Sequence, residues 1–217
     1  MTTPPPATPR PTTPRSTTPQ RTKRGAPVER FWHKHLGADG TWNAPWHGGP
    51  SDGPPGEDLA DLRAGLGRPA GSVPALWKHY TSRVDGAVTP ELEAEHGALS
   101  LYGLHQQGQP TPMHRRGVSA ARALRELRGT DEFTSAAMDR RVAAAVNATS
   151  VPAFLHRLRG LVPLLRGRSI AFDYDLLCGD LMDWAHPAKR PRVRRSWGAG
   201  YYPWERAAPA DPADPPS

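Results

Sequence analysis

The sequence of 217 residues contains only one cysteine, Cys178. A single thiol excludes an internal disulfide. Because Cys178 stands beside Leu177 and three residues before Leu181, the pattern predicts a buried, unreactive thiol. Long apolar runs are lacking too: none has the length of a signal-peptide core or approaches a membrane span. These absences predict a cytoplasmic protein with no membrane partner.

Motifs for covalent chemistry are also lacking. The sequence has no Gly-x-Ser-x-Gly pattern, no phosphate-binding loop and no cysteine pairs at zinc spacing. The only dense carboxylate group consists of Asp173, Asp175, Asp180 and Asp183, which a metal-dependent nuclease could use. Acids in a first helical turn or on a solvated helix face are the commoner interpretation. We therefore predict that the protein is not an enzyme, with the nuclease as the alternative.

Cofactor and metal sites are weakly indicated. Residues 31–56 hold three tryptophans and three histidines, followed by a Gly/Pro-rich loop. A His-x-His pattern with one further histidine and no cysteine is a poor zinc signature. Exposed aromatic faces could instead stack unpaired bases. The preferred interpretation is an irregular lead-in that its Trp side chains hold against the body, without a cofactor or a metal.

Proline is frequent, with 26 residues, but it is concentrated at the two ends. Residues 1–30 hold eight prolines among Thr, Ser and basic residues, a composition that predicts a disordered basic tail. The Ala/Asp/Pro-rich residues 203–217 predict a second disordered tail. After the lead-in at 31–56, we expect an N-terminal helical lobe at 57–111 and a basic C-terminal helical lobe at 112–202.

Apolar residues in the middle of the chain recur with a helical period, and none follow the period of a strand. Thr89 before Pro90, and Ser119, are expected helix caps, and Pro163 is expected to kink or shorten its helix. Met113 to Gly117 is expected to open a helix, and Trp77 to face inward. The expected helices span 57–66, 73–80, 89–107, 119–128, 134–146, 151–166, 172–185 and 189–198. The predicted fold class is all-α, with two small helical bundles.

The net charge of +7 is unevenly distributed. It amounts to +5 in residues 1–30, −4 in 31–111, +8 in 112–202 and −2 in the remainder. Such asymmetry indicates a polyanionic partner for the basic half and protein neighbours for the acidic half.

Arginine dominates the basic half. A guanidinium stays charged at physiological pH and binds phosphate oxygens in a fork, so Arg157, Arg159 and Arg166 are candidates for backbone contact. Arg115 and Arg116 are candidates for the same reason. No helix-turn-helix spacing stands out, so the prediction is binding with little sequence preference. Solvated helix faces, and a stand-alone helical DNA-binding regulator, are the alternatives.

Five stretches fall in an order that resembles one known family. In chain order they are Gly65-Leu66-Gly67-Arg68-Pro69, Leu99-Ser100-Leu101-Tyr102-Gly103-Leu104-His105-Gln106-Gln107, Met113-His114-Arg115, Leu158-Arg159-Gly160-Leu161-Val162-Pro163-Leu164-Leu165-Arg166, and Trp184…Arg192-Val193-Arg194…Trp197-Gly198…Tyr201-Tyr202. The series resembles the CasB small subunit of Cascade, the type I-E CRISPR effector. The likeness covers roughly residues 57–202 and does not extend to the N-terminal tail.

This resemblance implies a two-lobed, all-helical, non-catalytic subunit, present in two copies in Cascade. Its implied partners are the other Cascade subunits, a second copy of itself, the guide RNA with its target DNA, and single-stranded DNA. The implied role in antiviral defence is to hold the displaced strand and stabilise the R-loop. The arginines that it suggests for nucleic-acid contact are Arg63, Arg68, Arg115, Arg116, Arg157, Arg159, Arg166, Arg194 and Arg195.

Overall fold

The computed structural model describes residues 29–43, 53–128, 130 and 132–202, and within them every regular element is a helix. The predicted all-α class is therefore confirmed. The predicted tails fall outside the described residues, except for residues 29 and 30. The elements are α1 (Phe31–Lys34), α2 (Gly56–Ala64), the 3-10 helix η1 (Pro74–His79), α3 (Pro90–Gln106), α4 (Ala120–Glu126), α5 (Ser135–Val146), α6 (Val151–Gly167), α7 (Tyr174–Trp184) and α8 (Arg190–Tyr201).

Side-chain caps start most of the longer helices, including the two helices for which the sequence predicts them. The Thr89 hydroxyl accepts from the Leu92 amide at the start of α3, and Ser119 accepts from Arg122 at the start of α4. Ser150 caps α6 in the same way. Pro163, which was expected to kink or shorten α6, does not end it, because the helix continues to Gly167.

Two local expectations are wrong. Met113 to Gly117 does not open a helix, since α4 begins only at Ala120. Instead the Arg115 amide donates to the Phe172 carbonyl (3.0 Å), in an isolated parallel bridge between His114 and Phe172. Gly117 then has a φ of +77°, a left-handed conformation that suits glycine and interrupts a helical path.

Trp77 was expected to face inward, but it is 54% exposed. Its segment forms a 3-10 helix with three residues per turn, so Val73, Leu76 and His79 share the buried face. Trp77 falls beside that face, where its indole N–H donates to the Gly71 carbonyl (2.8 Å).

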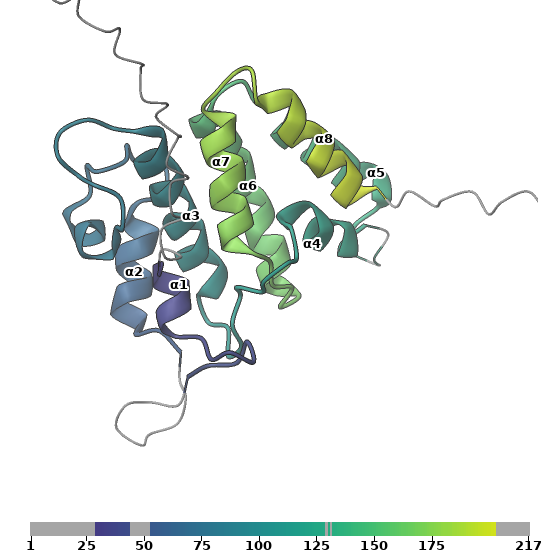
Figure 1. Ribbon diagram of the computed structural model, residues 1–217. Helices are drawn as coiled ribbons and strands as arrows, with labels where there is room; N and C mark the ends of the chain where they lie inside the picture. The colour runs from purple at the N-terminus through teal and green to yellow at the C-terminus, as the bar shows by residue number, and fades with distance from the viewer. Residues whose placement is uncertain (1–28, 44–52, 129, 131, 203–217) are drawn as a thin grey trace, which may run out of the picture.

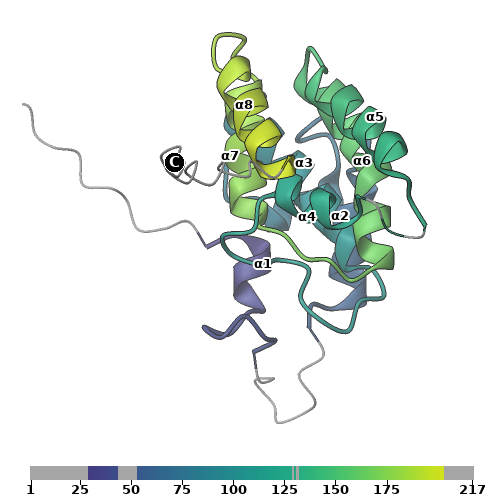
Figure 2. The same cartoon turned by 90° about the vertical axis from the view of Figure 1, so that its right-hand side faces the viewer.

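Helix α3 lies between α2 on one side and α6 and α7 on the other (Figures 1 and 2). Thirteen of its 17 residues are buried. Gly103 lets α2 approach closely, because a Cβ there would lie 2.6 Å from the Cβ of Leu62. Gly97 does the same for α6, where a Cβ would lie 2.6 Å from Leu155.

The hydrophobic core draws on both halves of the chain. Trp32 and Tyr102 belong to the same contiguous cluster as Phe154 and Trp184, whose rings stack with centroids 4.2 Å apart. His105 is buried in this core, and burial lowers its pKa to about 3. The boundary between two lobes near residue 111 stays a prediction. None of the described helices combines the length and apolar character needed to cross a membrane.

Candidate nucleic-acid interface

A cavity of about 430 Å³ lies where the loop after α2 meets α3 and α6. Arg68 reaches it from that loop, and His156 and Arg159 reach it from α6. Arg159 lies close to Gly67, because a Cβ at Gly67 would lie 3.4 Å from its Nη1, and the φ of +75° at Gly67 suits glycine. Cations from two separate elements therefore meet at this cavity.

A second cavity, of about 250 Å³, lies between α5 and α6, which run side by side in Figure 2. Arg141 lines it from α5, and Arg157 lines it from α6. Successive residues of an α-helix are about 100° apart around its axis, so two residues that are two positions apart differ by about 200°. Arg157 and Arg159 therefore point to opposite flanks of α6. His156 borders both cavities and so joins them.

We call Arg68, Arg141, His156, Arg157 and Arg159 the basic strip. All five are exposed, and none forms an ion pair with an acid among the described residues. Of the acids in the described ranges, only Glu93 lines either cavity. The strip thus presents positive charge from three elements that no acid in the described part of the chain neutralises, as a polyanion-binding surface requires.

Two of the other predicted arginines have protein partners. Arg166 donates through Nη1 to the Leu104 carbonyl and the Gln107 side chain (both 3.1 Å), which ties α6 to the end of α3. Arg194 donates through Nε to the Val146 carbonyl (2.8 Å), which fastens α8 to the end of α5.

The remaining four predicted arginines lie elsewhere, and none lines either cavity. Arg63 is half-buried near the end of α2, Arg115 and Arg116 are exposed in the turn before Gly117, and Arg195 is exposed on α8. The structure therefore brings together three of the nine predicted arginines: Arg68, Arg157 and Arg159.

The sequence prediction did not include Arg141 or His156. The Arg140-Arg141 pair is visible in the sequence, within a segment correctly expected to be helical. What the sequence does not show is that α5 packs against α6 with Arg141 facing Arg157.

The four aspartates proposed for a nuclease each serve a structural contact. Asp173 caps α7 and accepts from the Gly117 amide (2.7 Å). Asp180 accepts from the Trp197 indole (2.7 Å), and Asp183 pairs with Lys189 and Arg192. Asp175 accepts from residues of α1 and its N-cap. Among the described residues, no cluster of possible metal ligands contains two of these four carboxylates.

Asp180 predicts a pH dependence of stability. Burial raises the pKa of its carboxyl from the ordinary 3.8 to about 6. An acid with a higher pKa in the folded state stabilises the fold while protonated, and this contribution is lost as the pH rises towards 6. We expect Asp180→Asn to raise the free energy of unfolding at pH 7.5, by at most about 3 kcal/mol, since Asn can still accept from Trp197.

The measurement is urea unfolding of both proteins at pH 7.5 and pH 5. The gain should shrink at pH 5, where Asp180 of the wild type is largely protonated. A gain of equal size at both pH values would show that the charge of Asp180 is not its cause.

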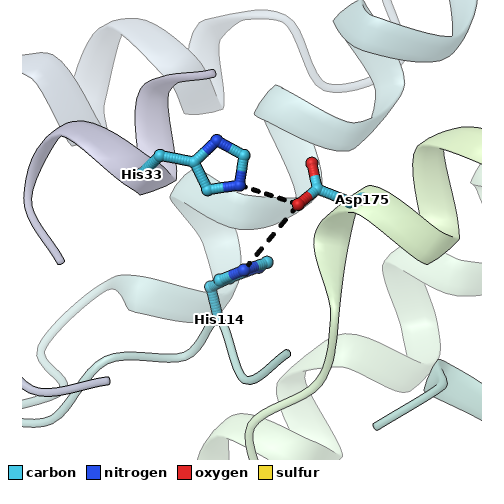
Figure 3. Close-up of side chains that lie close together, drawn as sticks. All are labelled: His33, His114 and Asp175. Carbon is cyan, nitrogen blue, oxygen red and sulfur yellow. Dashed lines mark hydrogen bonds and ion pairs between the residues drawn. The ribbon is translucent and has the colours of Figure 1, made fainter. Parts of the chain in front are cut away.

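His33, His114 and Asp175 come together from α1, the loop before α4, and α7 (Figure 3). The carboxylate Oδ2 of Asp175 lies 2.7 Å from the Nε2 of His33 and 4.0 Å from the Nε2 of His114. Its Oδ1 accepts from Arg30 (3.1 Å) and from the indole of Trp32 (3.3 Å). Asp175 therefore anchors the start of the described chain to α7.

The hydrogen bonds at this cluster do not suit a metal ion. A backbone amide donates to the Nδ1 of His33 (from Arg30) and to the Nδ1 of His114 (from Tyr174), so each neutral ring carries its proton on Nε2. Both N–H groups then face Asp175, whereas a metal there would need free lone pairs. Burial lowers the pKa of His114 to about 4 and keeps this ring neutral.

The second cluster of possible ligands, Asp58, Asp61 and His79, contains its own cation. The ammonium of Lys78 lies 2.9 Å from Asp58 and 3.0 Å from Asp61. Hydrogen bonds to these two carboxylates raise the pKa of Lys78, so it remains charged.

The Trp-rich lead-in is held against the body, as expected. Trp32 is fully buried, so its face cannot stack on a base, and the indole of Trp42 donates to the Pro110 carbonyl (2.7 Å). Trp46 and His47, which belong to the same prediction, lie outside the described residues.

Comparisons with known proteins agree with this architecture. The profile of the family "CRISPR-associated protein Cse2" matches residues 58–202. The crystal structure of CasB from Thermobifida fusca is 31% identical with a TM-score of 0.56, and the match covers 67% of this chain and 84% of that one. A Cse2-family protein from Thermus thermophilus, TTHB189, is 27% identical with a TM-score of 0.53, over 67% and 85% of the two chains.

A search among curated protein sequences finds no match. The family profile nevertheless covers more than half of the chain, and the similarity to CasB confirms the resemblance seen in the sequence. The protein therefore belongs to the Cse2 family of CRISPR-associated proteins.

Proposed function

We propose that this chain is a non-catalytic small subunit of the type I-E Cascade surveillance complex, and that it stabilises the R-loop. In this role the basic strip holds the sugar–phosphate backbone of the displaced DNA strand. The observation that carries the proposal is the convergence of Arg68, Arg141, Arg157 and Arg159, from three elements, without ion-pair partners among the described residues.

The physical reason is that R-loop formation exchanges one duplex for another of similar stability, so modest contacts with the displaced strand can shift the balance. Guanidinium groups bind phosphate oxygens and do not read bases, so this support is expected on any target sequence. A regulator that recognises one duplex would need base-edge contacts instead.

The proposed partners are the other Cascade subunits, a second copy of this chain, and the guide RNA paired with target DNA. Apart from Arg63 and Arg68, which we assign to nucleic acid, the acidic N-terminal half, with a charge of −4 over residues 31–111, suits protein neighbours better than DNA. Arg63, Arg115, Arg116 and Arg195, which lie away from the strip, are proposed to make further nucleic-acid contacts, as are Arg166 and Arg194.

The experiment is to assemble the surveillance complex with and without this chain and to measure R-loop lifetime on two unrelated targets. We expect the lifetime to fall on both targets when the chain is left out. Equal lifetimes with and without the chain would contradict the proposal. Cleavage of labelled DNA by the isolated chain with Mg²⁺ or Mn²⁺ would contradict its non-catalytic part.

A further inference from the structure

The larger cavity has apolar walls, which a phosphate-binding surface does not need. Its walls are largely apolar, with Pro69 and Ala70 from the loop after α2, Val88 from the segment before α3, and Leu101 and Leu155 from α3 and α6. A volume of about 430 Å³ lies within the roughly 300–1,000 Å³ of small-molecule sites. Exposed cations are sufficient to bind phosphates, and an apolar cavity is not needed for that. The apolar walls of this cavity instead fit an apolar group of a ligand.

Polar groups in the cavity are few and distinct. Ser100 is 2% exposed, and its hydroxyl has no hydrogen-bond partner among the residues that the structure describes. Glu93 adds a half-buried carboxylate, and burial raises the pKa of this group. His96 is already committed, because its Nδ1 lies 2.7 Å from the Tyr80 hydroxyl and its Nε2 lies 2.9 Å from the Arg68 carbonyl.

Arg68 and Arg159 stand at the same cavity without acidic partners among the described residues. The fitting ligand therefore joins a flat apolar part with polar edges to an adjacent anion. A nucleotide of a single strand has this composition, with a base that stacks on or packs against apolar walls and a phosphate that binds arginine. An apolar protein side chain would leave both guanidinium groups without a partner.

We propose that this cavity, which we call the base pocket, receives one unstacked nucleobase of the strand whose phosphates lie on the basic strip. The inference rests on the proposed function and deepens it. Inside the pocket, Glu93 can accept from a base N–H. Holding one base would add a contact to a base, whereas the phosphate contacts of the strip reach only the backbone.

The test compares a short single strand with the same strand in which every base is replaced by an abasic tetrahydrofuran. The full chain should bind the base-containing strand about tenfold more tightly, the contribution of one held base. The binding is measured by fluorescence anisotropy of the labelled strands.

A chemical plug then locates the effect. Val88→Cys places a thiol on the pocket wall, and modification with N-cyclohexylmaleimide fills the pocket with an aliphatic ring that cannot stack like an aromatic one. The native Cys178 is 1% exposed, and burial raises its pKa to about 11, so it should not react. The matched control is Val84→Cys, which is also exposed but does not line the pocket.

Modified Val88→Cys should bind both strands with the weaker affinity, whereas unmodified Val88→Cys and modified Val84→Cys should keep the tenfold difference. Equal binding of both strands by the wild type would overturn the base pocket and leave the proposed function standing. A tenfold difference that persists after modification of Val88→Cys would also contradict the base pocket. So would a modification that only prevents assembly with protein subunits. Failure of the wild type to bind either strand would contradict both the proposed function and the base pocket.

Discussion

Replacing Arg141, Arg157 and Arg159 with alanine is expected to lower the affinity for single-stranded DNA about 100-fold at 0.1 M salt. Each neutralised phosphate of a single strand contributes about 0.7 to the slope of log K against log salt, so three contacts contribute about 2. Between 1 M and 0.1 M salt, a slope of 2 corresponds to two decades in affinity. The measurement is anisotropy of a labelled strand, with circular dichroism to verify the fold.

The control removes the same charge elsewhere. Arg83, Arg122 and Arg140 are exposed and line neither cavity, so their replacement by alanine leaves the strip intact. Arg140 is the sequence neighbour of Arg141 on α5, which makes the pair a sharp comparison. We expect a loss below tenfold in this control. If both triple variants lost the same affinity, net charge rather than the strip would set the binding.

Asp175→Ala is expected to lower the free energy of unfolding by about 3 kcal/mol, because a group of donors would lose a shared acceptor. Arg30, Trp32 and His33 all donate to this carboxylate, and they fasten α1 to α7. Urea unfolding measures the loss.

Asp183→Ala is the control for this second prediction. Asp183 also lies on α7 and pairs with two cations, Lys189 and Arg192, but both of these are largely exposed. Surface ion pairs contribute about 0–1 kcal/mol, so its replacement should have little effect. Equal losses in the two variants would refute the role of Asp175 as an anchor.

Local sequence chemistry predicted much of the fold. Thr89 and Ser119 act as caps, because a hydroxyl that accepts from an amide three residues later needs no tertiary context. The wrong predictions of local structure arise where contacts between residues far apart in the sequence determine the backbone conformation. Residues 113–115 form a bridge with Phe172, which lies far along the chain, and Gly117 follows in a turn. The 3-10 turn at Trp77 changes the helical period from 3.6 to 3.

For the candidate site, too, the sequence predicts what depends on one helix and misses what depends on packing between helices. Arg157 and Arg159 could be predicted, because α6 has a core-facing stripe and these residues fall outside it. Arg166 lies on the same helix, but carbonyl and amide oxygens around the end of α3 occupy its guanidinium, which no single-helix pattern can reveal. Arg141 joins the strip only through the packing of α5 on α6.

The most direct test of the basic strip is the salt dependence of single-strand binding by the wild type and by the Arg141, Arg157 and Arg159 triple variant. If the three side chains contact one phosphate chain together, the slope of log K against log salt should decrease by about 2 in the variant. Parallel lines of equal slope would show that these arginines do not bind phosphates, and would contradict the assignment of the strip as the nucleic-acid interface.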